Sequence, residues 1–258
     1  MPFVAWSLSH KSEDSFRRFY LTEKGRKMSS LRIQDLENIQ AFVGDMLTGL
    51  EMHGLTFETD ANMWNWRKLL ESAPGGIGVS RALDPELNNL ESGNAFWLYA
   101  KNRAGDIVAC QADRLVITED FVGDYVATHR LFGDLRPVIH HYTVRLGERY
   151  PLISGRVNLG GGAWVHPAWR GKNLGGIMSR LARALSVRHF LADYFVTFMA
   201  TGRNFGVECG FRNKCAIIKG RYPGREADQD MDLLWECRRE ILEQISEEQR
   251  HHANEVAA

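Results

Sequence analysis

The segment from residue 164 to 178 holds the residue types best suited to binding an anionic ligand. It reads WVHPAWRGKNLGGIM, an apolar strand followed by a loop with glycines and two cations, Arg170 and Lys172. The loop is expected to open directly into a helix, whose first N–H groups have no partner within the helix. Small residues let the backbone approach a ligand, and the helix dipole favours negative charge at this end. This pattern predicts a site for a phosphate or pyrophosphate group.

Two other phosphate-binding patterns are absent from this segment. Neither the Walker loop, Gly-x-x-x-x-Gly-Lys-Ser/Thr, nor the dinucleotide turn, Gly-x-Gly-x-x-Gly, occurs in it. Two other interpretations stay open. One is a strand-to-helix turn that binds no ligand, and the other is a nucleotide-binding enzyme that uses the loop for a different phosphate.

The segment resembles the acyl-CoA loop of the GNAT N-acyltransferase superfamily. The family pattern is Arg/Gln-x-x-Gly-x-Gly/Ala after a strand that ends in Val-x-Pro, and residues 165–167, Arg170 and Gly175 match it. Asn173 stands where the first glycine is expected, and asparagine also tolerates left-handed backbone geometry. Cys209-Gly210-Phe211 and the run from 231 to 235 are similar to the family's later helix end and last strand.

The resemblance implies the fold class, a mixed α/β (α+β) domain. Its central, strongly twisted sheet is flanked by helices, and two neighbouring parallel strands splay apart. By position these strands are 157–165 and 194–200, with the pantetheine arm of CoA between them. We expect one domain over residues 1–258, with an uncertain segment 1–30, insertions at about 75–93 and 118–150, and a charged helix over 238–258.

The resemblance also implies acetyl-CoA as co-substrate, with no metal. Trp164 and Val165 would contact the pantetheine through main-chain groups, and Asn204 would lie near the arm. The expected pyrophosphate site comprises Arg170, Gly171, Lys172, Asn173, Leu174, Gly175 and Gly176.

The implied function is direct transfer of an acetyl or other acyl group from CoA to a primary amine of a small molecule or protein. The reaction needs a neutral amine, a polarised thioester carbonyl and a proton for the leaving thiolate. The family's usual acid, a tyrosine, is replaced by Gly206, and residues 157–165 contain no carboxylate. Tyr142, His141 and His166 are therefore the candidate catalytic residues. The alternative is a non-catalytic CoA-binding regulatory module.

Ordinary structural roles compete with several of these assignments. The run 140–142 is more simply a surface or packing cluster, and His166 an exposed residue. Residues 75–78 are read as a flexible loop. The tryptophans at 64, 66 and 97 are expected in the core or hairpin, and the arginines at 180, 183 and 188 on a solvated helix face.

Hydrophobic periodicity and turn residues predict the remaining elements. Helices are expected over 31–52, 61–72, from 174 onward and around 203–209, and strands over 96–100, 107–110, 157–165, 194–200, 215–221 and 231–237. The first two helices are taken as a pair that leads into the 96–110 hairpin.

Composition limits the partners. The 258 residues carry 32 Lys and Arg against 32 Asp and Glu, which argues against a uniformly basic surface for nucleic acid or membranes. Residues 165–225 nevertheless hold 11 Lys and Arg against 2 Asp and Glu, where the phosphate loop is expected. The four cysteines lack zinc-site or disulfide spacing, and no long apolar run occurs. We expect a cytoplasmic protein, and the resemblance leaves a homodimer open.

Overall fold

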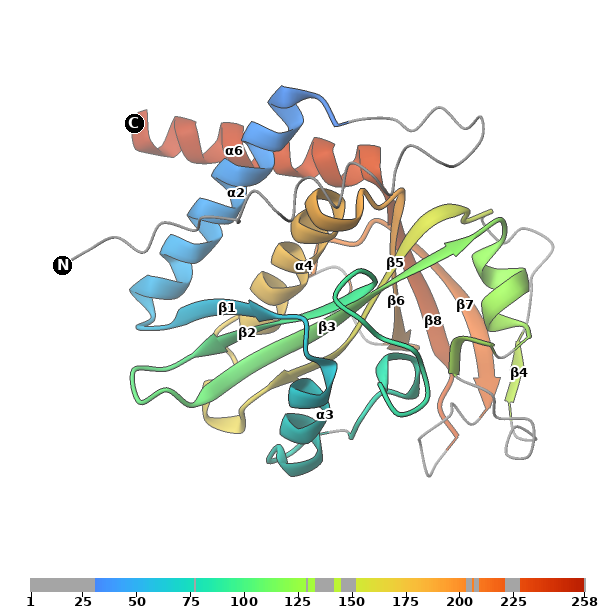
Figure 1. Ribbon diagram of the computed structural model, residues 1–258. Helices are drawn as coiled ribbons and strands as arrows, with labels where there is room; N and C mark the ends of the chain where they lie inside the picture. The colour runs from blue at the N-terminus through green and yellow to red at the C-terminus, as the bar shows by residue number, and fades with distance from the viewer. Residues whose placement is uncertain are drawn as a thin grey trace. The chain divides into compact units, whose positions relative to one another are not determined.

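Eight segments of the chain pair into one open sheet, in the order β1-β2-β3-β5-β6-β8-β7-β4 (Figure 1). The computed structural model describes residues 31–76, 78–128, 130–132, 142–144, 152–202, 206, 209–220 and 228–257. The strands are β1 (Thr56–Asp60), β2 (Ala95–Lys101), β3 (Ile107–Thr118), β4 (Tyr142–Val144), β5 (Gly155–Val165), β6 (Tyr194–Ala200), β7 (Asn213–Gly220) and β8 (Met231–Cys237). The mixed α/β class expected from the sequence is confirmed.

One parallel pair interrupts an otherwise antiparallel sheet. β5 and β6 are paired in parallel only from Val157↔Tyr194 to Leu159↔Val196. Beyond that point β5 continues beside β3, and β6 continues beside β8. Among the described residues no ladder pair joins residues 160–165 to β6. The two strands therefore part in the middle of the sheet, as the splayed pair expected from the sequence does.

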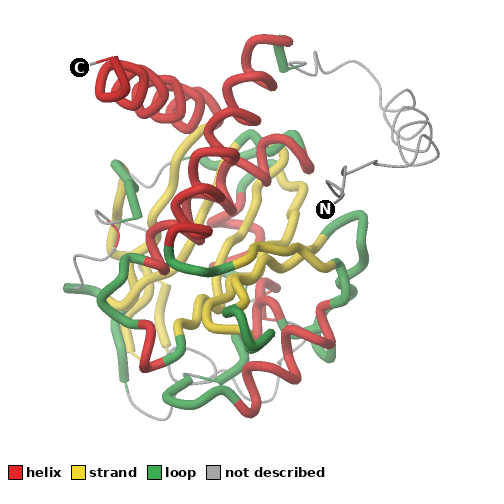
Figure 2. Tube along the Cα trace, turned by 90° about the vertical axis from the view of Figure 1, so that its left-hand side faces the viewer, coloured by secondary structure: helices red, strands yellow, loops and turns green. Residues whose placement is uncertain are grey.

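Helices lie on both faces of the sheet (Figures 1 and 2). α2 (Ile33–Met52), α4 (Leu174–Phe190) and α6 (Arg238–Ala257) lie together on one side, and α3 (Met63–Ser72) lies on the other. Phe190 of α4 packs on Phe96 of β2 at a ring-centroid distance of 5.3 Å. On the opposite face, Trp66 of α3 is fully buried with Trp97 of β2.

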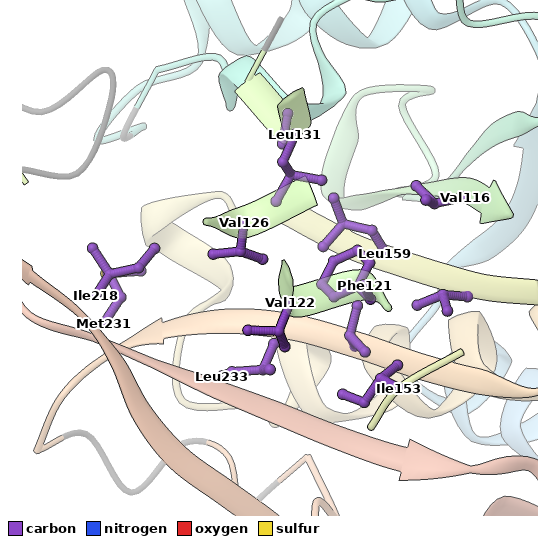
Figure 3. Packing of buried hydrophobic residues seen from close by; sticks show 13 residues of the cluster. Val116, Phe121, Val122, Val126, Leu131, Ile153, Leu159, Ile218, Met231 and Leu233 are labelled. Atoms are coloured by element: carbon purple, nitrogen blue, oxygen red, sulfur yellow. The ribbon is translucent and has the colours of Figure 1, made fainter. Parts of the chain in front are cut away.

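The region expected to be an insertion contributes to the core. The short helical turn η2 (Phe121–Val126) places Phe121, Val122 and Val126 against apolar side chains of β5, β7 and β8. Figure 3 shows these side chains converging with Leu159 and Leu233. Burial of such a cluster is the main force that holds the segment on the sheet.

The structure corrects several expectations, among them the core or hairpin position expected for Trp64, which is 54% exposed. β1 separates α2 from α3, so the two helices are not a contiguous pair. Its sequence, TFETD, is short and has one apolar residue, so hydrophobic periodicity does not detect it. β3 extends to Thr118, well beyond the expected hairpin strand. Arg183 is not solvated: it is 3% exposed and pairs with Glu236 of β8.

Other expectations fall partly or wholly outside the described residues. These are the segment 1–30, the run 140–141 and most of the helix around 203–209. Within the described part, the chain from Arg32 to Ala258 groups as one compact unit.

A bulge in β5 explains the run of three glycines at 160–162. Between Cys110↔Trp164 and Ala112↔Gly161 the ladder gains one residue on β5. Gly162 adopts φ 57°, in the left-handed region. A Cβ at this position would lie 2.2 Å from Cζ2 of Trp66. Glycine is thus required both for the backbone and for the space.

Substituting Gly162 is expected to destabilise the fold. Gly162→Ala combines left-handed strain with overpacking against Trp66, and should lower the free energy of unfolding by about 2–4 kcal/mol in urea denaturation. Gly171→Ala is the matched control, because Gly171 has φ 79° and no atom within 4 Å of the added Cβ. Its loss should be about 1 kcal/mol from backbone strain alone. Equal losses in the two variants would contradict the packing argument.

Candidate functional site

The loop between β5 and α4 forms the centre of the candidate site. After Val165 the chain makes a short helical turn, η4 (Pro167–Trp169), and α4 begins at Leu174. Gly171 has φ 79° and Asn173 has φ 55°, so both lie in the left-handed region. The backbone at Asn173 thus adopts the left-handed geometry that asparagine tolerates.

The first turn of α4 supplies free backbone donors. α4 starts at Leu174, and Gly175 and Gly176 follow within the first turn. The first described intrahelical bond at this end is from Ile177 N to Asn173 O, at 3.1 Å. The amides before it point out of the helix end, and no acidic residue lies in this turn. The geometry suits an anion.

The two cations of the loop have specific contacts. The Nζ of Lys172 lies 4.4 Å from the ring centroid of Trp169, as a cation–π contact. Arg170 donates from Nε to the carbonyl of Val165 at 3.2 Å and from Nη2 to the carbonyl of Gly75 at 3.0 Å. Gly75 is therefore hydrogen-bonded to the loop between β5 and α4. This differs from the flexible loop that the sequence predicts for residues 75–78.

Trp164 faces the core with its side chain. It is 6% exposed and packs with the α3 cluster, and its Nε1 donates to Pro74 O at 3.1 Å. Its backbone pairs with Cys110 on β3. Trp164 can therefore contact a ligand between β5 and β6 only through its main-chain groups.

The two candidate catalytic residues that lie within the described chain, His166 and Tyr142, are not brought together. His166 lies beside the loop, where its Nδ1 accepts a hydrogen bond from the Ala168 amide at 3.2 Å. Tyr142 lies on β4, which is four strands from β5 in the sheet order. At a strand spacing of about 4.8 Å this separation is roughly 19 Å. His141 and Asn204 lie outside the described residues.

A buried carboxylate beneath α4 was missed by sequence reasoning. Asp113 of β3 is fully buried, opposite Gly160 of β5, and its Oδ1 accepts from Asn158 Nδ2 at 2.7 Å. Burial raises the pKa of Asp113 to about 7, against the lowering effect of the Asn158 hydrogen bond. An aspartate inside the strand sequence IVACQADRLVIT was the available signal.

The comparisons with known proteins find relatives by structure alone. No family model and no curated protein matches the chain. NAA60 of Arabidopsis thaliana, solved with acetyl-CoA, is 10% identical with a TM-score of 0.45, over 71% of this chain and 99% of that chain. A GNAT-family acetyltransferase from Streptococcus pneumoniae is 12% identical with a TM-score of 0.37, over 70% and 98%. The ribosomal-protein-S5-alanine acetyltransferase of Vibrio fischeri is 12% identical with a TM-score of 0.38, over 71% and 93%.

These three solved structures, to which the chain is similar, are all acetyltransferases. Gly206 lies close to Leu234 of β8. A Cβ at Gly206 would lie 2.3 Å from Cδ2 of Leu234, so a side chain does not fit unless Leu234 moves. The leucine of β8 occupies the space that a larger residue would need.

A second carboxylate lies where β6 ends. Asp232 of β8 is opposite Met199 and is 4% exposed. Its Oδ1 accepts from the Thr201 hydroxyl at 2.7 Å, and its Oδ2 lies 3.7 Å from Lys214 Nζ. The sequence signal was a single aspartate in the apolar run MDLLW. Asp232 lies near the end of β6, beyond the point where β5 and β6 part. It is a candidate for proton transfer.

Two features are absent from the described residues. No group of three or more His, Cys, Asp or Glu is arranged to hold a metal ion in that part of the chain. The helices within the same residues include none with the length and apolar character needed to cross a membrane.

Proposed function

We propose that this protein is a GNAT-type N-acyltransferase that transfers an acetyl group from acetyl-CoA to a primary amine. The observation that carries the proposal is the junction of two features. β5 and β6 part after Leu159, and β5 then leads directly into the amide-rich start of α4. The edge of β5 that has no ladder partner on β6 therefore leads toward the proposed anion site, and this order matches that of the thiol arm and the phosphates in CoA.

Each part of CoA has a proposed contact. The pantetheine arm would pair with the edge of β5 over residues 160–165, which faces β6 without a ladder partner in the described chain. The pyrophosphate would accept from the amides of residues 171–176, and Lys172 would add positive charge. The excess of basic residues over 165–225 favours a ligand with several phosphate charges.

The proposed reaction is direct attack of a neutral amine on the thioester carbonyl. The new C–N bond forms as the C–S bond breaks, the amine loses a proton, and the thiolate gains one. Backbone N–H groups of β5 would polarise the carbonyl. We assign proton acceptance from the amine to Asp232, which is the buried carboxylate beside the end of β6. In this layout His166 lies beside the loop, at the phosphate end of the arm, so we do not assign it as the acid that protonates the thiolate.

Calorimetry with acetyl-CoA tests the proposed binding site. Wild-type protein is expected to bind, and Gly175→Glu should weaken binding by about 100-fold, because a carboxylate at the helix start repels the pyrophosphate. The matched control is Gly44→Glu, which adds the same side chain to an exposed position of α2 with nothing within 4 Å. Its affinity should equal that of the wild type. Absence of wild-type binding would refute the proposal.

A non-catalytic CoA-binding module is the second candidate function. It is favoured by the space filled by Leu234 at the tyrosine position and by the absence of carboxylates over residues 157–165. Thiol release from acetyl-CoA, measured with polyamines, aminoglycosides and peptides with free amino termini, separates the two. Amine-dependent release with any of them excludes the non-catalytic module, and binding without release across the panel supports it.

A further inference from the structure

The turn that follows α3 is built to present its carbonyl groups. Gly76 N donates to Ala73 O at 3.1 Å and closes a β-turn with Pro74 and Gly75 at its centre. Gly75 has φ 61°, so the turn has proline at its second position and a left-handed glycine at its third. This fixed geometry directs both central carbonyls outward from the turn.

Both of these carbonyls are bound by the segment that leads into α4. Trp164 Nε1 donates to Pro74 O at 3.1 Å, and Arg170 Nη2 donates to Gly75 O at 3.0 Å. A Cβ at Gly75 would lie 3.0 Å from Nη2 of Arg170 and 3.3 Å from Cγ of Pro167. The close approach therefore depends on the glycine.

The guanidinium of Arg170 joins two distant parts of the chain. Its Nε donates to Val165 O at 3.2 Å while Nη2 holds Gly75 O, so one planar group bridges the end of β5 and the turn after α3. A lysine cannot do this, because its ammonium is a point charge without the fixed fork of donors. Two donors of the arginine are thus directed at carbonyls of the protein.

We infer that Arg170 is a positioning residue: it clasps the turn 73–76 to the start of the acyl-CoA loop, and it is not the charge that holds the CoA phosphates. In the proposed function, the amides of residues 171–176 and Lys172 hold those phosphates. The turn then forms a fixed wall beside the loop, and its position depends on the Arg170 fork. The part of this inference that concerns CoA rests on the proposed function.

The clasp itself is tested without any ligand. The indole N–H resonance of Trp164, assigned with Trp164→Phe, reports the hydrogen bond to Pro74 O. In both Arg170→Ala and Arg170→Lys the resonance should shift, and the hydrogen exchange of the indole N–H should become about 10-fold faster, because neither variant has the fork. Lys172→Ala is the control and should leave the indole unchanged. An unshifted indole in Arg170→Lys would overturn the inference.

The salt dependence of acetyl-CoA binding tests the second half. Each cation that contacts a phosphate adds to the slope of log affinity against log salt concentration. Arg170→Ala should keep the wild-type slope, whereas Lys172→Ala should have a shallower one. A shallower slope in Arg170→Ala, restored in Arg170→Lys, would overturn the inference. If wild-type protein does not bind acetyl-CoA, the proposed function fails, and the indole measurement still decides the clasp.

Discussion

Arg183→Ala is expected to lower the free energy of unfolding by about 3–5 kcal/mol, measured by urea denaturation. Arg183 and Glu236 are both buried, at 3% and 0% exposure, and form an ion pair between α4 and β8. Removing the arginine leaves the carboxylate buried without its cation. It also removes a cation–π contact with Phe211, whose ring centroid lies 4.9 Å from Cζ of Arg183.

A second arginine of the same helix provides the control. Arg180 pairs with Glu248 at 3.4 Å, with both side chains about one-third exposed. Arg180→Ala should therefore cost at most about 1 kcal/mol. The double variant Arg183→Met with Glu236→Gln should recover a large part of the loss, because no unpaired charge stays buried. A loss for Arg183→Ala no greater than that for Arg180→Ala would contradict the expectation.

The pair also belongs to a hydrogen-bond network that reaches the turn before β7. Arg183 donates to the carbonyl of Cys209, and Gln244 of α6 donates to the carbonyl of Gly210 at 3.1 Å. These bonds fix the turn that ends at Phe211, five positions after Gly206. Glu236 thus anchors α4, α6 and this turn through one buried network.

The buried carboxyl of Asp113 should make stability fall as pH rises. Its pKa is about 7 in the folded protein, raised by burial, against about 3.9 when unfolded. The folded state therefore binds the proton more tightly than the unfolded state. The resulting contribution to the free energy of unfolding is complete below about pH 4 and is lost by about pH 7. The full loss is about 4 kcal/mol, of which about 2–3 kcal/mol falls between pH 5 and pH 8.

Asp113→Asn isolates this effect. The amide cannot ionise, so the stability of the variant should lack this pH dependence. From pH 5 to pH 8 the wild type should therefore lose about 2–3 kcal/mol of unfolding free energy relative to the variant. Asp113 Oδ2 and Asn158 Oδ1 have no hydrogen-bond partner in the described chain, so a donor at this position has an acceptor to use. Asp106→Asn, at an exposed turn, is the control. A pH-independent difference for Asp113→Asn would contradict the assignment.

Local pattern was enough to predict the elements that form the centre of the site. The apolar strand before residue 165, the loop with Arg170 and Lys172, and the helix with glycines in its first turn are neighbours in sequence. Their geometry is set by short-range rules for glycine, asparagine and helix ends. The tolerance of Asn173 for left-handed backbone is one such rule, and the structure shows it at φ 55°.

The features that were missed depend on residues far apart in the chain. Arg183 lies away from the apolar stripe of its helix, and only Glu236, more than 50 positions later, explains its burial. The bond from Arg170 to Gly75 spans 95 positions. Tyr142 was grouped with the site because nothing in the sequence states that β4 lies at the far edge of the sheet. Periodicity reports one face of one element and not the partner that covers it.

Amide chemical shifts measured with CoA and with pantetheine test the central claim most directly. The proposed complex predicts that CoA shifts the resonances of residues 160–165 and 171–176, whereas pantetheine, which lacks the phosphates, shifts only those of 160–165. The difference would place the phosphates at the start of α4 and the arm along β5. Saturating CoA that leaves the resonances of residues 171–176 unchanged would contradict the proposed site.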